Sequence, residues 1–423
     1  MSDSERVIGI IGSGTMGAGI AQAAATAGFV VKTLDTDQQL VKDAYQGIRE
    51  RLDGKLAKGK LSQVERDAIV ERLHVASGLS DIKDVECIIE AVPEDLALKR
   101  RIFSEIDRVV SPRTLLATNT SSLSIAKIAD GLKNIDRFIG MHFFNPAPVM
   151  KLIELVRGPE TGDQAVVGAR AVCTKLSKTA VLVKDSPGFI GNRVNRPFYL
   201  EAMRLLESGE ADVLTIDAAV RDVGGFRMGP FELLDLIGLD VNLRVTETVY
   251  NGFGKPKRFT PSPIQKKLVS EGHLGRKSGR GFYDHSDGRL IPAFETRAKD
   301  ASSWGPSPAL CEFARMIGKP ADRPTWIYAR IFLAVMMEGT LVAETIALPR
   351  DVDLAMQLGF NYKTGPLSVA DFVGLDIIKN LLADFYEESQ HDELYQPNSL
   401  LDKRVAEGNL GEKTARGLLY HAL

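Results

Sequence analysis

Short apolar runs alternate with amphipathic stretches from the N-terminus to Asp185. The apolar runs predict strands at residues 6–11, 29–35, 85–92, 114–119, 138–144, 151–156 and 180–184. The stretches with apolar positions three and four apart predict helices near 15–27, 37–60, 62–73, 95–110 and 163–177. This alternation is typical of a mostly parallel sheet that is covered by helices on both faces.

Helical periodicity replaces the alternation after Asp185. It is clear in NRPFYLEAMRLLESG (195–209), LTIDAAVRDVG (214–224) and FELLDLIGLDVNLRV (231–245), and strand-like runs all but vanish. A change of period of this kind indicates a domain boundary, which we place at DSPGFIGNR (185–193).

The helical part contains an internal repeat. GPFELLDLIGLD (229–240) recurs as GPLSVADFVGLD (365–376), and LGRKSGRGF (274–282) recurs as LGEKTARGL (410–418), both at an offset of 136 residues. Matches at one spacing indicate a duplicated helical module. Three single residues repeat as well: Asp217 as Asp353 at 136, and Arg193 as Arg330 and Glu201 as Glu338 at 137. The predicted domains are 1–186, 187–288 and 323–423, with a linker at 289–322.

The composition is that of an ordinary globular protein, with a formal net charge of −2. This charge gives no reason to expect a nucleic-acid or membrane partner. No apolar run approaches the ~20 residues that a membrane span needs, and MSDSER is not a signal peptide. Three distant cysteines are expected to be reduced core residues, with no metal site, so we expect a cytoplasmic protein.

A glycine-rich loop, IGSGTMG, follows the first predicted strand and opens the first predicted helix. Gly12 suits the tight turn, Gly14 the approach of a pyrophosphate, and Gly17 the close packing of helix on strand. The helix N-terminus adds free N–H groups and a positive dipole. Asp35 ends the next strand and would accept from ribose hydroxyls and repel a 2′-phosphate, which favours NAD over NADP.

Polar residues also follow two later strands. Glu94 and Lys99 come after the strand at 85–92, and the hydroxyl residues 120–122 come after Asn119. Ligands of open α/β sheets lie beyond the carboxyl ends of strands. A cluster of serine and threonine before a helix is also a common N-cap, and both roles stay open here.

The segment GMHFFNPAPVMKLIE (140–154) combines two strand-like runs with a bend at Pro146-Ala147-Pro148. If the runs pair antiparallel about Pro148, residues whose numbers sum to 296 face each other, and His142 faces Glu154. A carboxylate behind a histidine fixes its tautomer and stabilises the imidazolium, as a general base requires. A buried structural histidine is the alternative.

Seven motifs, in order, resemble the L-3-hydroxyacyl-CoA dehydrogenase family, 3-hydroxybutyryl-CoA dehydrogenases included. They are IGSGTMGAGIAQ, EAVPEDLALK, NTSSLSI, GMHFFNPAPVMKLIELV, DSPGFIGNR, MGPFELLDLIGLD and GRKSGRGFY, between residue 6 and about residue 284. The resemblance implies a Rossmann-type NAD-binding domain followed by two related all-α domains of the 6-phosphogluconate dehydrogenase C-terminal type. It implies NAD-dependent oxidation of L-3-hydroxyacyl-CoA to 3-ketoacyl-CoA, and the reverse, as in fatty-acid β-oxidation or 3-hydroxybutyryl-CoA metabolism.

The resemblance also assigns residues. The catalytic set falls on His142, Glu154, Ser121 and Asn192, and Ser121 and Asn192 also bind substrate. The dinucleotide contacts fall on Gly12, Gly14, Thr15, Met16, Gly17, Asp35, Glu94, Lys99, Ser121 and Asn145. Lys58 and the nearby Lys55 match the region where relatives meet coenzyme A phosphates, although a lysine run on a helix is equally a solvated face.

The second helical copy departs from this pattern. TWIYAR (325–330) corresponds to GFIGNR, and Ala329 stands where the first copy has Asn192. No second HFFN segment precedes it, so we expect a non-catalytic copy. In single-copy relatives the helical domain forms the dimer interface. We therefore expect either a monomer with pseudo-dimeric helical domains or a homodimer.

Other functions stay open. Relatives with the same motifs oxidise small hydroxy acids or carnitine, but Lys55, Lys58 and Lys60 favour a coenzyme A thioester. A non-catalytic NAD-binding structural protein is opposed by the intact catalytic set. A part of a multifunctional β-oxidation enzyme is a further alternative. No hydratase-like sequence precedes Met1, so we expect any coupling to be to a separate enoyl-CoA hydratase. Acyl chain length, a second substrate carboxylate and the physiological direction are left open.

Overall fold

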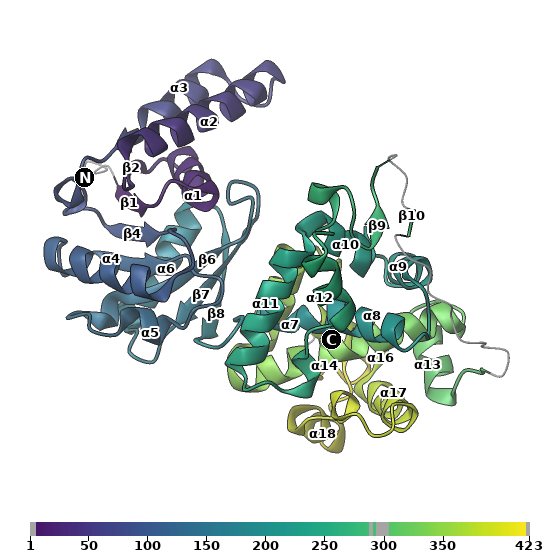
Figure 1. Ribbon diagram of the computed structural model, residues 1–423. Helices are drawn as coiled ribbons and strands as arrows, with labels where there is room; N and C mark the ends of the chain where they lie inside the picture. Colours follow the sequence, from purple (N-terminus) through teal and green to yellow (C-terminus); the bar gives the residue numbers. More distant parts are fainter. Residues whose placement is uncertain (1–5, 287–290, 293–303, 420–423) are drawn as a thin grey trace. The chain divides into compact units, whose positions relative to one another are not determined.

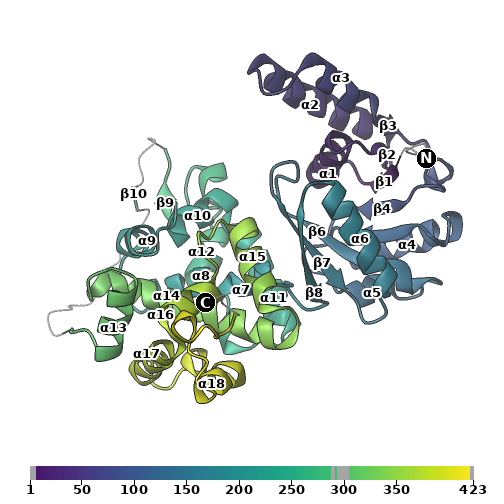
Figure 2. The same ribbon diagram turned by 180° about the vertical axis from the view of Figure 1, so that it is seen from behind.

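The computed structural model describes residues 6–286, 291–292 and 304–419 of the 423-residue chain (Figures 1 and 2). The chain separates into two compact units, the first ending at Phe189 and the second beginning at Ile190. The first unit is the α/β part that the alternating pattern predicts, and the second is almost entirely helical.

An eight-stranded sheet in the order β3-β2-β1-β4-β5-β6-β7-β8 forms the centre of the first unit. All neighbouring strands are parallel except the pair β6–β7. Its central strands β4, β5 and β6 are buried along their whole length, since helices cover both faces. The strands are β1 (Val7–Ile11), β2 (Val30–Leu34), β3 (Leu73–Val75), β4 (Cys87–Glu90), β5 (Leu115–Thr118), β6 (Phe138–Phe143), β7 (Leu152–Arg157) and β8 (Thr179–Lys184).

Side-chain caps start most helices of the first unit. Asp37 and Asp95 accept from backbone N–H groups of α2 and α4, and Ser62 forms a capping box with Glu65 on α3. Figures 1 and 2 show α2 and α3 as a pair that projects beyond the sheet. The helices are α1 (Thr15–Thr26), α2 (Gln38–Ala57), α3 (Gln63–Glu71), α4 (Leu96–Val109), α5 (Ile125–Ala129) and α6 (Asp163–Lys175), with short 3₁₀ turns η1 (Leu79–Ile82) and η2 (Ile135–Arg137).

The second unit is built around its longest helix, α14. Its first half holds α7 (Gly191–Val194), α8 (Arg196–Glu207), α9 (Val213–Asp222), α10 (Pro230–Ile237), α11 (Leu239–Gly252), η3 (Lys257–Phe259), α12 (Pro263–Ser270), η4 (Arg276–Ser278), and the short strands β9 (Tyr283–Asp284) and β10 (Ile291–Pro292). Its second half holds α13 (Pro308–Met316), α14 (Arg323–Thr345), α15 (Pro349–Phe360), α16 (Pro366–Val373), α17 (Leu375–Glu388), η5 (Glu393–Tyr395), α18 (Ser399–Ala406) and η6 (Glu412–Thr414).

The internal repeat recurs in the backbone. Asp217 accepts from the first N–H groups of α10, and Asp353 does the same for α16. The next helices, α11 and α17, each begin directly after a glycine with positive φ, Gly238 at 102° and Gly374 at 107°. These equivalences are those expected of two copies of one module. The predicted boundaries at 288 and 322 within the second unit stay predictions.

The two copies are joined by reciprocal ion pairs. Arg193 of the first copy donates to Glu338 of the second at 2.5 Å, and Arg330 of the second donates to Glu201 of the first at 2.6 Å. Because Arg330 and Glu338 are the counterparts of Arg193 and Glu201, each copy makes the same contact to the other. That is the pattern of a two-fold symmetric interface.

Among the described helices, α14 alone is long and apolar enough to cross a membrane, and 83% of its apolar window is buried inside the molecule. That burial is typical of a core helix. It packs against α8 and α9 of the first copy and against α15 and α16 of its own.

Three features differ from the sequence-based expectations. The short elements β3 and α5 were missed, because three and five residues are too few for a clear period. The helical run at 231–245 is two helices, broken at Gly238. The prediction that all cysteines lie in the core was wrong for Cys311, which is exposed, whereas Cys87 and Cys173 are buried.

Candidate active site

The hairpin β6–β7 places His142 opposite Glu154 and Phe143 opposite Ile153. The predicted register is therefore confirmed. Nδ1 of His142 lies 2.7 Å from Oε2 of Glu154. The Glu154 side chain is fully buried and only 9% of the His142 side chain is exposed. The pair is thus held in a nearly dry environment, where a hydrogen bond between them is strong.

The bend between the two strands is fixed by local bonds. The N–H groups of Val149 and Met150 both donate to the carbonyl of Pro146. The Lys178 ammonium, from the start of β8, donates to the carbonyls of Ala147 and Met150. Burial lowers the pKa of Lys178 below its ordinary value. The bend is therefore tied to the neighbouring strand.

Packing also orients the His142 ring. The Phe144 ring lies 4.7 Å from it and the Phe189 ring 5.9 Å, centroid to centroid. Since Glu154 engages Nδ1, the other ring nitrogen, Nε2, is left for a reacting group. The arrangement has the geometry of a general base and its orienting carboxylate.

The glycine loop fits a dinucleotide. Gly12 has φ of 96°, and a Cβ there would lie 2.8 Å from the carbonyl oxygen of Ala91. A Cβ at Gly17 would lie 1.9 Å from the carbonyl oxygen of Gly12, whereas one at Gly14 would meet nothing within 4 Å. Two glycines are thus required by packing, and Gly14 faces open space at the N-terminus of α1. Thr15 and Met16 begin that helix, so the loop and helix end form the cradle that a pyrophosphate needs.

Asp35 lies directly after β2, beside the glycine loop. Its Oδ2 accepts from the backbone N–H of Ser13 at 2.6 Å and from the Ser13 hydroxyl at 2.7 Å, and Thr36 donates to Oδ1. Burial alone would raise the pKa of Asp35, but these hydrogen bonds outweigh it and the pKa is lowered. Asp35 is therefore ionised at neutral pH, as an acceptor for ribose hydroxyls must be.

Glu94 organises the loop after β5. Its Oε1 accepts from the Thr120 hydroxyl at 2.5 Å and from the backbone N–H groups of Ser121 and Ser122. Burial would raise the pKa of Glu94, but the Lys99 charge and these bonds lower it. The N-cap of α5 is Ser124. The hydroxyls of 120–122 are therefore not the helix cap, which resolves one alternative.

The Lys99 side chain is more buried than expected of a residue that contacts the dinucleotide. Only 1% of its side chain is exposed, and Nζ lies 2.6 Å from Glu90 and 3.4 Å from Glu94. The geometry gives it a positioning role behind Glu94, and its predicted contact with the dinucleotide stays a prediction. The remaining first-unit candidates Asn145, Lys55 and Lys58 are exposed, and both lysines lie at the C-terminal end of α2.

Asn192 belongs to the second unit. It lies half-buried on α7, and the Arg196 guanidinium donates to its backbone carbonyl at 3.0 Å. Its predicted meeting with His142 stays a prediction. One residue that the sequence analysis did not assign is Asn119, whose Oδ1 accepts from the N–H of Phe143 at 2.8 Å. An asparagine directly after a central strand was the available signal.

Fold and site together define a class. A glycine loop at the first strand of a parallel sheet, an ionised aspartate after the second strand and a buried histidine–carboxylate pair are the features of an NAD-dependent oxidoreductase. Residues 7–186 match the family model "3-hydroxyacyl-CoA dehydrogenase, NAD binding domain". Residues 188–285 and 326–421 each match "3-hydroxyacyl-CoA dehydrogenase, C-terminal domain".

Individual relatives agree. The chain is 36% identical to a 3-hydroxyadipyl-CoA dehydrogenase of Escherichia coli (strain K12), over 95% of this chain and 97% of that one. It is 40% identical to a probable 3-hydroxybutyryl-CoA dehydrogenase of Bacillus subtilis (strain 168), over 66% and 96%. A crystal structure of 3-hydroxybutyryl-CoA dehydrogenase from Escherichia coli K12 matches with a TM-score of 0.85 and 34% identity, covering 96% of this chain and 99% of that one.

The chain therefore belongs to the 3-hydroxyacyl-CoA dehydrogenase family. Its activity is the NAD-dependent oxidation of 3-hydroxyacyl-CoA, with NAD as cofactor.

Proposed function

We propose that His142 is the general base of this reaction and that L-3-hydroxyacyl-CoA is the substrate enantiomer. The observation that carries the assignment of the base is the buried 2.7 Å contact between His142 and Glu154, whereas the L enantiomer is proposed from the family resemblance alone. With Nδ1 engaged by the carboxylate, Nε2 takes the proton of the 3-hydroxyl group. Glu154 offsets the charge that the ring gains.

NAD, when bound, accepts the hydride from the carbon that carries this hydroxyl. The side chain of Ser121 is proposed to hydrogen-bond the reacting oxygen, whose charge changes in the transition state. A substrate-binding role is proposed for Asn192 from the family resemblance. In the ketoacyl direction, the same His142 returns the proton. The role of the protein is to position the reactants and to hold one proton at Nε2.

The dinucleotide contacts are proposed from the cradle geometry. The loop from Gly12 to Gly17 takes the pyrophosphate, and Asp35 accepts from the adenine-side ribose. Glu94 orders Ser121 beside the nicotinamide side, and Lys99 holds Glu94 in place. Asn145, exposed at the hairpin bend, completes the set.

Coenzyme A is proposed to meet Lys55 and Lys58, which are exposed at the end of α2. Two ammonium groups on a projecting helix complement phosphate groups. The names of relatives include a dicarboxylic 3-hydroxyadipyl-CoA and the short 3-hydroxybutyryl-CoA. Both are thioesters, so the thioester is the common requirement.

A kinetic panel tests this function. Acetoacetyl-CoA, longer 3-ketoacyl-CoA esters and a dicarboxylic ester are each assayed with NADH and with NADPH, beside free acetoacetate. Free 3-hydroxybutyrate and carnitine are assayed in the oxidative direction with NAD. We expect turnover of the thioesters with NADH and little with NADPH. Equal turnover of free hydroxy or keto acids would contradict the coenzyme A assignment and favour the related small-substrate dehydrogenases.

The second helical copy is proposed to replace the dimer partner of single-copy relatives, which makes the chain a monomer. The reciprocal pairs Arg193–Glu338 and Arg330–Glu201 support this, because they reproduce a two-fold interface within one chain. A cytoplasmic location and supply of substrate by a separate enoyl-CoA hydratase are further parts of the proposal. Supply by a hydratase is supported by its chemistry, since hydration of an enoyl-CoA yields a 3-hydroxyacyl-CoA.

A further inference from the structure

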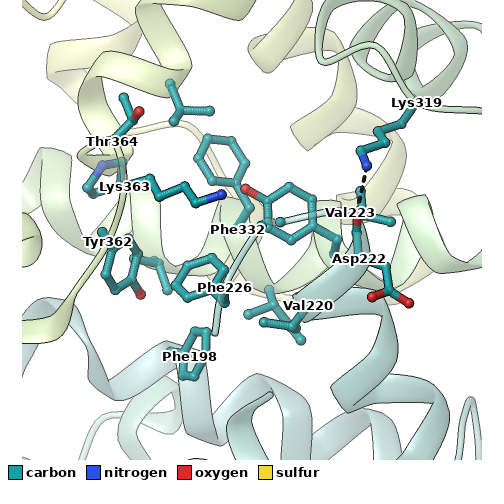
Figure 3. A pocket seen from close by; sticks show the side chains of 17 residues that line it. Phe198, Val220, Asp222, Val223, Phe226, Lys319, Phe332, Tyr362, Lys363 and Thr364 are labelled. Carbon is teal, nitrogen blue, oxygen red and sulfur yellow. Dashed lines mark hydrogen bonds between the residues drawn. The ribbon is translucent and has the colours of Figure 1, made fainter. Parts of the chain in front are cut away.

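A cavity of about 330 Å³ lies in the second unit, between the two helical copies (Figure 3). Small-ligand pockets occupy roughly 300–1,000 Å³, so its size is that of a site for a small molecule. Five of its 17 lining residues are aromatic, two from the first copy and three from the second: Phe198, Phe226, Tyr328, Phe332 and Tyr362.

The aromatic wall is packed as a unit. The Phe226 and Tyr362 rings meet edge to face at 4.8 Å, and the Phe198 and Phe226 rings lie 5.3 Å apart. The Tyr362 hydroxyl donates to Asn195 at 2.9 Å. Rings held by several partners give a preformed apolar surface, so a ligand need not order them on binding.

Two lysines border the cavity. Nζ of Lys319 already donates to the backbone carbonyl of Asp222 at 2.6 Å. Lys363 reaches into the cavity from the same side as Tyr362 and Thr364, as Figure 3 shows. A Cβ built at Gly225 would lie 3.3 Å from Nζ of Lys363, so the ammonium group lies against the glycine turn. Among the described residues, no carboxylate forms an ion pair with Lys363.

The position of the cavity follows from the duplication. Tyr328 and Ile331, which line it, flank Ala329 and Arg330, the counterparts of Asn192 and Arg193. The cavity is therefore lined in part by the helix that carries Ala329, the counterpart of Asn192, although Ala329 itself is not a lining residue.

The backbone supports this equivalence. Gly225 and its counterpart Asn361 both have positive φ, 70° and 58°. Phe226 and Tyr362, which follow them, both line the cavity. The residue types differ between the copies, however. Tyr328 of the second copy stands at the position of Gly191, and Phe332 stands at that of Asn195. Polar and small positions of the first copy have become aromatic.

We propose that this cavity is a second, non-catalytic binding site for a medium-chain aliphatic carboxylate. The chain lies against the aromatic wall, and the carboxylate pairs with Lys363. The charged lining residues are Lys319, Lys363 and Asp222, and among the described residues Lys363 forms no ion pair. An apolar interior with this net positive border complements an amphipathic anion. Only the comparison with the first copy rests on the proposed role of Asn192; the lining and its charge do not.

Calorimetric titration of the full-length chain tests the site. Octanoate is the probe, and octylammonium and 1-octanol are matched controls of the same chain length. We expect octanoate to bind at least about tenfold more tightly than octylammonium, since only the anion pairs with Lys363. Lys363→Glu should weaken octanoate binding about tenfold, and Val369→Trp, which fills the cavity, should abolish it.

Lys266→Glu, an exposed lysine on α12, is the matched charge control and should leave octanoate binding unchanged. A circular dichroism melt shows whether Val369→Trp is folded, and Lys363→Glu tests the site independently of that variant. His142→Gln should bind octanoate as the wild type does, so loss of the proposed catalytic role would not affect this result.

The proposal is overturned if octanoate and octylammonium bind equally, or if Lys363→Glu leaves octanoate affinity unchanged. It is also overturned if octanoate is a purely competitive inhibitor against acetoacetyl-CoA with the same inhibition constant in Val369→Trp. In that case the carboxylate occupies the catalytic site and not the cavity between the copies.

Discussion

At the scale of single residues, the hydrogen bond between His142 and Glu154 is the central feature of the site. Both side chains are almost fully buried, and each provides the other with a polar partner there. Asp35 is held ionised in a comparable way by Ser13 and Thr36. In both arrangements the side chain is held in place before a ligand binds. Little free energy is then spent on reorganising the site during the reaction.

Replacing His142 tests its role as the base. His142→Gln should lower kcat by about 10²- to 10⁴-fold, since proton transfer loses its acceptor, while NADH affinity measured by fluorescence changes little. Glu154→Gln should be milder but still severe. His74→Gln, an exposed histidine on β3, serves as the control with wild-type turnover. Near-wild-type turnover of His142→Gln would contradict the proposal that His142 is the general base.

Replacing Asp35 tests cofactor selection. Asp35→Asn removes the negative charge that we propose to accept from ribose and to repel a 2′-phosphate. KM for NADH should therefore rise about tenfold, and the preference for NADH over NADPH should narrow. The matched control is Asp37→Asn, because Asp37 caps α2 and asparagine caps equally well. An unchanged ratio of kcat/KM for NADH and NADPH in Asp35→Asn would contradict the role.

At the scale of elements, the sequence predicted the hairpin β6–β7 down to its register. The prediction came from the bend at Pro146-Ala147-Pro148, since an antiparallel pair that turns at Pro148 places His142 opposite Glu154. Burial does not select this register, because β6 and nearly all of β7 are buried on both faces. The break between α10 and α11 could not be predicted in the same way. A glycine is tolerated inside a helical pattern, and only the positive φ of Gly238, 102°, shows that the helix ends there.

The caps of α10 and α16 give a prediction at this scale. Asp353 accepts from the N–H groups of Leu367 and Ser368 at 2.9 and 2.8 Å. Asp353→Ala should therefore lower the free energy of unfolding by about 1–3 kcal/mol, measured by urea denaturation, with KM for NADH unchanged. Asp402→Ala, on the exposed surface of α18, should change stability by less than about 0.5 kcal/mol. Lost turnover without lost stability would show that the second copy takes part in catalysis.

At the scale of the whole molecule, the duplication gives the second unit an internal two-fold interface. Glu201 is fully buried there and is bound by Arg330, Arg204 and the Tyr395 hydroxyl. Burial alone would raise the pKa of Glu201, but these partners, chiefly Arg330, hold the pKa at about 2. Since the folded-state pKa is depressed, Glu201 stabilises the fold above its ordinary pKa, and this contribution is lost as the pH falls toward 2.

Glu201→Gln should leave Arg330 buried without its charge partner and cost about 3–5 kcal/mol of stability at pH 7. The difference in the free energy of unfolding from wild type should shrink as the pH falls from about 4.5 toward 2, measured by urea unfolding at each pH.

The oligomeric state gives a further prediction at this scale. Wild type should run as a monomer in calibrated gel filtration with light scattering. A dimer joined through residues 187–285, or a stability difference that does not depend on pH, would contradict the internal interface.

The sequence by itself determined the order of the longer strands and helices of the first unit, the glycine loop, the duplication and the facing of His142 and Glu154. These follow from periodicity, turn residues and internal matches, all of which are local or repeated in the chain. The tertiary structure alone decided that Lys99 is buried behind Glu94, that Arg193 and Arg330 cross between copies, and that an aromatic cavity lies between them. Each depends on contacts between residues far apart in the chain, and no local pattern specifies those contacts.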